Sequence, residues 1–149
     1  MKPQQLEAGL DALDALKGFE ALCCFVTEDE RPLSGAAGFV DWRLCGELSR
    51  VLQSGFFVGA PGDKLLVPTH ARLNAPKLFA VGLGTSGAVT ALGLEHALTS
   101  AASMLTKAGV VSVALALPSL PKALAGQRDD LVERSFAAHF QGAVAVFSS

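Results

Sequence analysis

The sequence predicts an α/β fold in which a mostly parallel central sheet lies between helices on both faces, giving three layers. Short runs of apolar residues alternate along the chain with longer segments whose apolar residues recur at helical spacing. The first of these runs, residues 21–27, is apolar on both faces, which is typical of an interior strand covered by helices. The length of 149 residues fits a single domain, which we expect to span residues 1–149.

The elements of the first half follow from changes in hydrophobic period. The first twenty residues carry the weakest pattern, and the strand at residues 21–27 comes next. Across residues 39–52 the apolar positions recur at helical spacing, which predicts one amphipathic helix. We expect Trp42 and Cys45 to be packed on this helix.

The later elements alternate between strands and helices. A short strand is predicted at residues 64–67, and Pro68 ends it or places it near a sheet edge. The remaining elements are a strand at residues 78–81, a helix from Ala91 to Ala108, a strand at residues 110–117, a helix that starts near Asp129, and a closing strand at residues 143–147.

The composition limits the classes of partner. Hydrophobic residues make up 50% of the chain and charged residues 17%, against an average of about 25% charged. The excess predicts either a large core or an apolar surface that contacts another protein or a second copy. The net charge of −2 provides no basic surface, so we expect no nucleic-acid partner and no membrane partner.

The cysteines and the amino terminus indicate a compartment. The chain has three cysteines, two of them adjacent at Cys23 and Cys24, which is a poor basis for a disulfide framework and favours a reducing compartment. The first eighteen residues contain three acids and no apolar run, unlike a secretory signal. We therefore expect a cytoplasmic protein.

One segment resembles a phosphate-binding site. Residues 77–87 read KLFAVGLGTSG, in which a strand enters a turn with the spacing G-x-G-x-x-G and a helix follows. Glycines let a phosphate approach the backbone, and N–H groups at the start of a helix can hold it. The candidate ligand-binding residues are Gly82, Gly84, Thr85, Ser86 and Gly87.

The surroundings of this segment favour a structural role over dinucleotide binding. A dinucleotide fingerprint needs an acid about 20 residues on, at the end of the next strand. That strand ends instead in Pro118 and Ser119, and the motif follows at least two strands rather than opening the fold. Gly82 and Gly84 would then simply allow a tight exit from a central strand.

No other residues assemble into a reactive site. The three histidines lack a second ligand at zinc spacing, and Cys23 and Cys24 should point to opposite faces of their strand as buried, inert thiols. The acidic run at residues 28–30 is typical of a solvated loop, and Ser86 is not in a G-x-S-x-G elbow. We therefore predict no catalytic residue, no metal site and no cofactor.

The order of segments is similar to the amino-terminal domain of leucyl aminopeptidases, a family of two-zinc cytosolic exopeptidases. The resemblance runs from about Leu13 to Phe140. It rests on ALCCFVT, the helix VDWRLCGELSRVLQSG, the loop GAPG, the strand KLLVP and the strand exit FAVGLG. It implies a macrodomain-like fold. It also implies a non-catalytic domain, because the zinc ligands and the N-T-D-A-E-G-R signature of the family belong to a separate carboxy-terminal domain.

Two functions remain open at this point. The resemblance implies a non-enzymatic domain that acts through protein contacts, with a protein partner or a homo-oligomer as its assembly. The alternative is a binder of ADP-ribose or another phosphorylated small molecule, which would use the turn at residues 82–87 as macrodomains use theirs.

Overall fold

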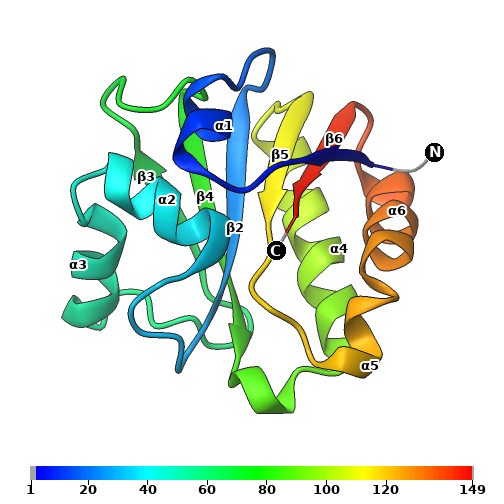
Figure 1. Cartoon of the computed structure of the whole chain (residues 1–149). Helices are drawn as coiled ribbons and strands as arrows, with labels where there is room; N and C mark the ends of the chain where they lie inside the picture. Colours follow the sequence, from blue (N-terminus) through cyan, green and yellow to red (C-terminus); the bar gives the residue numbers. More distant parts are fainter. Residues whose placement is uncertain (1–2, 149) are drawn as a thin grey trace.

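Six strands form one sheet in the computed structural model, which describes residues 3–148 (Figure 1). Their order across the sheet is β1-β6-β5-β2-β4-β3. Every neighbouring pair is parallel except β3 and β4, which are antiparallel, so the predicted mostly parallel sheet is confirmed. The strands are β1 (Gln4–Leu6), β2 (Ala21–Thr27), β3 (Lys64–Pro68), β4 (Lys77–Gly84), β5 (Ser112–Ala116) and β6 (Ala143–Phe147).

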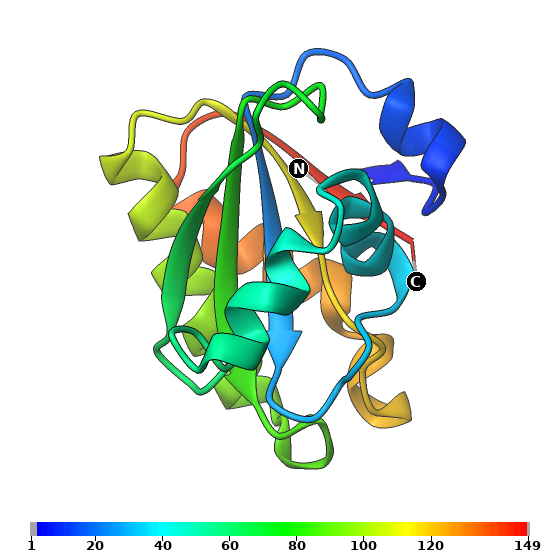
Figure 2. The same cartoon turned by 90° about the vertical axis from the view of Figure 1, so that its left-hand side faces the viewer.

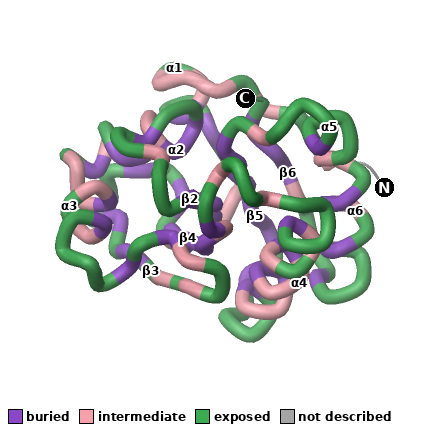
Figure 3. Tube along the Cα trace, turned by 90° about the horizontal axis from the view of Figure 1, so that it is seen from below, coloured by how far each residue is buried: buried purple, intermediate pink, exposed green. Residues whose placement is uncertain are grey.

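Helices cover both faces of the sheet, which confirms the three layers (Figure 2). One face carries α1 (Leu10–Asp14), α2 (Gly35–Arg43) and α3 (Glu47–Ser54). The other face carries α4 (Ala91–Lys107), α5 (Lys122–Ala125) and α6 (Arg128–His139). Buried positions concentrate on the strands and on the sides of the helices that face them (Figure 3).

The central strand β2 supplies side chains to both cores. All seven of its residues are buried, and alternate side chains point to opposite faces. Cys24 packs in the core under α1, α2 and α3, whereas Cys23 packs in the core under α4 and α6. The prediction of a strand that is apolar on both faces is therefore confirmed.

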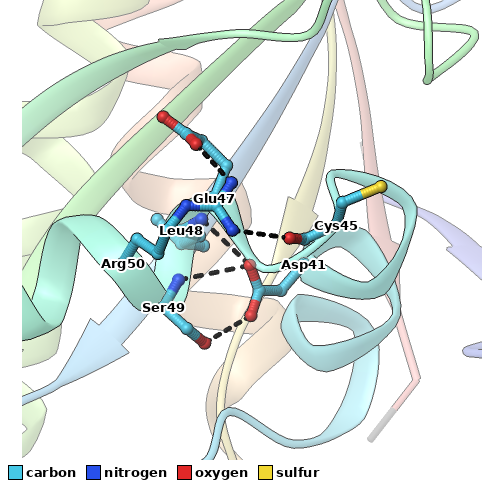
Figure 4. A network of polar contacts seen from close by, with 6 residues as sticks. All are labelled: Asp41, Cys45, Glu47, Leu48, Ser49 and Arg50. Atoms are coloured by element: carbon cyan, nitrogen blue, oxygen red, sulfur yellow. Dashed lines mark hydrogen bonds and ion pairs between the residues drawn. The ribbon is translucent and has the colours of Figure 1, made fainter.

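The predicted helix over residues 39–52 is wrong in its continuity. The structure has two helices, α2 and α3, separated at residues 44–46. Cys45 has φ 56° and Gly46 has φ 79°, and this left-handed turn interrupts the helical hydrogen bonding. The Asp41 carboxylate accepts hydrogen bonds from the backbone N–H of Leu48 at 2.9 Å and of Ser49 at 3.2 Å, and from the Ser49 hydroxyl (Figure 4). Asp41, which belongs to α2, thus caps the first turn of α3.

Two residues expected to be packed on that helix are exposed instead. The side chain of Trp42 is 69% exposed, because it lies on the outward side of α2 while Val40 and Leu44 face the core. Cys45 is exposed because it occupies the turn between the two helices. The break therefore accounts for the exposure of Cys45, whereas Trp42 is exposed by its place on the outward side of α2.

The remaining elements follow the predictions with shifted ends. β3 is an edge strand, as Pro68 indicated, and β4 continues through Gly84 rather than ending at Val81. The strand expected at residues 110–117 is shorter, because its pairing with the neighbouring strand β6 begins only at Ser112. Two elements lie in the segment of weakest pattern: α1, and β1 on the edge opposite β3. Across residues 3–148, no helix is long and apolar enough to cross a membrane.

Candidate functional site

The candidate residues lie where β4 ends, and they do not form a single turn. Gly82 and Gly84 belong to β4, Thr85 follows the strand, and Ser86 and Gly87 begin the short 3-10 helix η1 (Ser86–Ala88). Beside them β2 also ends, and the backbone N–H of residue 28 donates to the Gly84 carbonyl at 2.9 Å. The structure therefore brings the five residues to one end of the central strands.

The two strand glycines make room for a neighbouring loop, formed by residues 59–62. A Cβ atom added at Gly82 would lie 2.0 Å from the Ala60 carbonyl oxygen and 2.6 Å from the Gly59 carbonyl carbon, which no side chain can occupy. Gly84 has φ +83° and donates its backbone N–H to the Gly59 carbonyl at 2.8 Å. Each glycine thus has a packing or backbone reason to be there.

The Asp29 carboxylate already accepts hydrogen bonds from both polar groups of Ser86. The backbone N–H of Ser86 donates to Asp29 Oδ1 at 2.9 Å, and its hydroxyl donates to Asp29 Oδ2 at 2.7 Å. These bonds to Ser86 stabilise the charged form and lower the pKa of the Asp29 carboxyl. A phosphate bound at this N–H would have to displace Asp29, and it would also meet Glu28, whose carboxylate accepts from the Thr85 hydroxyl at 3.4 Å.

The sequence did not reveal this contact. The acidic run was interpreted as a solvated loop, and Asp29 is indeed exposed, but its carboxylate holds the start of η1. Asp29 and Ser86 are 57 residues apart in the chain, so no local spacing connects them. The topology alone could have indicated the contact. Asp29 follows β2 and Ser86 follows β4, and two neighbouring parallel strands end at the same edge of the sheet.

The cysteines of β2 are unsuited to chemistry. Burial raises the pKa of the Cys24 thiol to about 12, and it raises the pKa of the Cys23 thiol well above its ordinary value. The two side chains point into different cores, as expected of adjacent residues in a strand. Within residues 3–148, no group of three His, Cys, Asp or Glu side chains is placed to hold a metal ion.

A hollow lies directly beside the glycine segment, between α4, the end of β4 and the edge strand β3, and the candidate residue Gly82 is part of its wall. It has a volume of about 910 Å³. Its walls combine apolar residues such as Val81 and Leu92 with the polar groups of Lys64, His96 and His139. The groove exists because α4 packs over β4 and β2 and leaves the face of the edge strand uncovered. Of the five candidate residues, Gly82 lines this groove, whereas Gly84, Thr85, Ser86 and Gly87 are not among its wall residues.

The comparisons with other proteins identify a family. The family model described as "Cytosol aminopeptidase family, N-terminal domain" matches residues 21–141. A probable cytosol aminopeptidase of Burkholderia multivorans is 33% identical over 93 residues, which are 62% of this chain and 18% of that protein. A second, from Desulfovibrio desulfuricans, is 35% identical over 77 residues, 52% of this chain and 15% of that protein. The chain thus spans about a fifth of the length of the curated relatives it matches.

Solved structures share the fold at low sequence identity. A variant of tomato leucine aminopeptidase superimposes with a TM-score of 0.69 at 16% identity, over 99% of this chain and 32% of that chain. The macrodomain of Thermus aquaticus DarG gives a TM-score of 0.71 at 14% identity, over 98% of this chain and 97% of that chain. These likenesses confirm the macrodomain-like fold. Together with the family match, they show that the chain belongs to the cytosol aminopeptidase family, in which it corresponds to the N-terminal domain.

Proposed function

We propose that this domain is non-catalytic and acts in the cytoplasm as a protein-interaction or assembly module. The observation that carries the proposal is the number of large apolar side chains left in water on a domain of this size. The exposed fractions are 69% for Trp42, 81% for Phe56, 58% for Leu66, 65% for Leu92 and 59% for Val111. Single exposed apolar residues are common, but two of these, Trp42 and Leu92, also line hollows, and exposed apolar surface of this kind is typical of protein contacts.

The relatives add a second reason to expect partners. In them the matched segment is 18% of a longer chain, so it exists alongside further protein. The groove between α4 and β3 leaves part of the sheet uncovered, and Leu92 lies at its rim. In the pairing of β3 with β4, Leu66 lies opposite Phe79, which belongs to the core under α4 and α6. The exposed side chain of Leu66 therefore points to the same, uncovered side of the sheet.

The polar groups support a structural role over a reactive one. The carboxylate nearest the glycine segment, Asp29, is bound by Ser86, and the buried carboxylate of Asp41 is bound by Leu48 and Ser49. A catalytic group needs a free position for a substrate atom within hydrogen-bonding reach. Both carboxylates are engaged in holding the starts of helical turns.

The proposal is tested by measuring assembly directly. The purified domain is analysed by sedimentation velocity, and cells expressing it are treated with a lysine-reactive cross-linker before mass spectrometry. We expect a mass above that of the monomer, or a reproducible cross-linked partner whose links place it on the exposed apolar residues. Substituting Leu66 and Leu92 by aspartate tests the groove, with a Lys122→Glu variant as a charge control. A monomer without specific cross-links would contradict the proposal.

The alternative is that the domain binds ADP-ribose or another phosphorylated small molecule at residues 82–87. Its support is that one similar structure, the DarTG protein of Thermosipho africanus with a TM-score of 0.60, was solved in complex with ADP-ribose. A thermal-shift measurement with ADP-ribose distinguishes the two functions. Binding at a hundredfold excess over Kd would stabilise the fold by about 2.7 kcal/mol. The Asp29→Asn variant weakens the hold on Ser86, so ligand binding there should strengthen in it.

A further inference from the structure

The groove between α4 and β3 combines apolar surface with charged and polar groups. Its volume of about 910 Å³ lies within the range of roughly 300–1,000 Å³ that is typical of small-molecule sites. Four of its wall residues belong to the core under α4 and α6 or pack against it: Val81, Leu83, Val89 and Ala97. Leu92 adds a side chain that is 65% exposed. The groove can therefore remove an apolar body from water.

The edge strand β3 places a cation beside this apolar surface. In the pairing of β3 with β4, Lys64 lies opposite Val81, so the two side chains point to the same, α4 side of the sheet. Both residues line the groove. Lys64 is exposed, and it forms no ion pair with any of residues 3–148.

The other charged groups of the wall leave this cation unbalanced. They are Glu95, His96 and His139. Glu95 is paired with Arg134 of α6 at 3.6 Å. Asp63 precedes Lys64 in the chain but does not line the groove, and its carboxylate accepts from two backbone N–H groups of the preceding loop at 3.3 and 3.2 Å. The groove thus has one uncompensated positive charge, and protonation of its two imidazoles can only add to it.

Three hydroxyl groups on the wall are free to bond a ligand. Thr99, Ser100 and Ser103 lie on α4, and their side chains form no hydrogen bond with any residue in the described range 3–148. The Thr90 hydroxyl differs, because it caps α4 by accepting from the Gly93 N–H at 3.0 Å. A free hydroxyl can exchange water for a ligand atom without breaking a bond inside the protein.

We propose that this groove binds a small amphipathic anion, with the acid group at Lys64 and the apolar body along Val81, Leu83 and Val89. An apolar body alone would leave the charge of Lys64 unused, and a purely polar anion would leave the apolar wall exposed to water. The acid group is a carboxylate or a phosphate, since a lysine ammonium binds either one as a point charge.

This ligand goes beyond the proposed function and does not depend on it. Exposed aromatic residues that do not line the groove, Trp42 and Phe56, remain for contacts with other protein. The site also differs from the one considered for ADP-ribose, in which the N–H of Ser86 would hold a phosphate. Here Asp29 stays bound to Ser86 and the anion meets Lys64 instead.

A matched set of small molecules tests the acid group and the apolar body separately. The whole chain is titrated by calorimetry with dodecanoate and with dodecyl phosphate, which distinguish the two acids. Butyrate and inorganic phosphate supply the acid without the body, and dodecyltrimethylammonium supplies the body with the opposite charge. Below the micelle concentrations, we expect at least one of the two long-chain acids to bind about tenfold or more tightly than these three controls. Backbone amide NMR shifts should place it on β3, the end of β4 and α4.

Variants of the wall locate the site. Lys64→Met removes the charge but keeps a long side chain, and we expect it to raise the Kd of the long-chain acid by about tenfold or more. Lys122→Met is the matched control, because Lys122 is exposed and does not line the groove. Ser100→Phe fills the groove and should abolish binding, whereas Ser100→Ala should retain most of it. Thermal unfolding of each variant without ligand verifies its fold.

Three outcomes overturn the proposal and leave the proposed function to its own test. Dodecyltrimethylammonium binding as tightly as the acids would show an apolar surface that does not select an anion. Equal losses in Lys64→Met and Lys122→Met would show that the groove does not set the affinity. Absence of binding by both long-chain acids would exclude this ligand, and cross-links from Lys64 to another protein would then show what covers the groove. Conversely, a monomer without cross-links that binds dodecanoate at Lys64 would contradict only the proposed function.

Discussion

The ends of β2 and β4 and the break between α2 and α3 are built on the same polar arrangement in different surroundings. At the strand ends the Asp29 carboxylate accepts from the N–H and hydroxyl of Ser86, and at the helix break the Asp41 carboxylate accepts from the N–H and hydroxyl of Ser49. Asp29 is exposed, whereas Asp41 is buried. A similar carboxylate cap can therefore hold a surface loop or start the second of two successive helices.

The two regions also differ in whether they leave a large apolar side chain exposed to water. At the strand ends, Gly82 and Gly84 pack against a neighbouring loop, and the polar groups of Ser86 are bound by Asp29. At the helix break the cap is complete, yet Trp42 remains in water beside two hollows. The glycine motif draws attention in the sequence, but it is the helix break that leaves a large apolar side chain exposed. Four variants test this contrast, beginning with the largest expected effect.

The close loop packing at the strand ends predicts the most severe variant, Gly82→Ala. The new methyl group would collide with the backbone of Gly59 and Ala60, which cannot move without releasing the loop from β4. We expect a loss of about 3 kcal/mol or more in unfolding free energy, measured by urea denaturation. Gly87→Ala is the control within the same motif, because a Cβ atom there has no neighbour within 4 Å. Equal losses in both variants would show that the motif acts through something other than loop packing.

The buried cap predicts the next largest effect, from Asp41→Ala. The variant leaves the N–H groups of Leu48 and Ser49 without their acceptor and removes the cap that starts α3. We expect a loss of about 2 kcal/mol in unfolding free energy, again measured by urea denaturation. Asp41→Asn keeps one carbonyl oxygen as an acceptor and should lose less. If Asp41→Ala were as stable as the wild type, the break would be held by Cys45 and Gly46 alone.

The exposed cap predicts a smaller and pH-dependent effect, from Asp29→Asn. The folded-state pKa of Asp29 is lowered, so its contribution to stability is present above the unfolded-state pKa and disappears as the pH falls through the folded-state pKa. The wild type should therefore be more stable than Asp29→Asn at neutral pH, and the difference should shrink below about pH 3.8. Thermal unfolding at several pH values measures this. A difference that persists in strong acid would contradict the assignment of the effect to this carboxylate.

The smallest expected change in stability comes from Trp42→Ala. The side chain is 69% exposed in the monomer, so its removal should change the unfolding free energy by less than about 0.5 kcal/mol under dilute conditions. Urea denaturation at low protein concentration provides the measurement, and Val40→Ala in the buried side of α2 is the contrasting variant. A large loss in dilute Trp42→Ala would mean that the indole stabilises the monomer, which would weaken its assignment as a contact residue.

The sequence was sufficient for the elements whose period is local. The strand at residues 21–27, the helix starting at Ala91 and the closing strand at residues 143–147 all lie where the pattern placed them. The break at residues 44–46 could not be read in the same way, because the apolar positions on both sides of it remain in helical phase. The interruption depends on Asp41 turning its carboxylate toward residues seven and eight positions ahead.

The position of the glycine motif in the fold could be predicted from the sequence, but the hydrogen bonds that engage its polar groups could not. The motif at residues 82–87 does lie at the carboxyl end of a central strand, where ligands bind in many α/β folds. Whether its N–H groups are free depends on Asp29 and Gly59, which come from distant parts of the chain. Local spacing shows which backbone N–H groups a motif could present to a ligand. Only the packing of distant segments determines which of those groups remain free.

The adjacent cysteines of β2 make opening of the fold measurable by thiol reactivity. Both thiols are sealed within the sheet, one in each core, and they can react only when the central strand separates from its covering helices. Cys45 on the surface reacts without any opening. The same sample therefore contains one thiol that reacts without any opening and two buried thiols whose reaction rates measure how readily each layer of helices separates from the sheet.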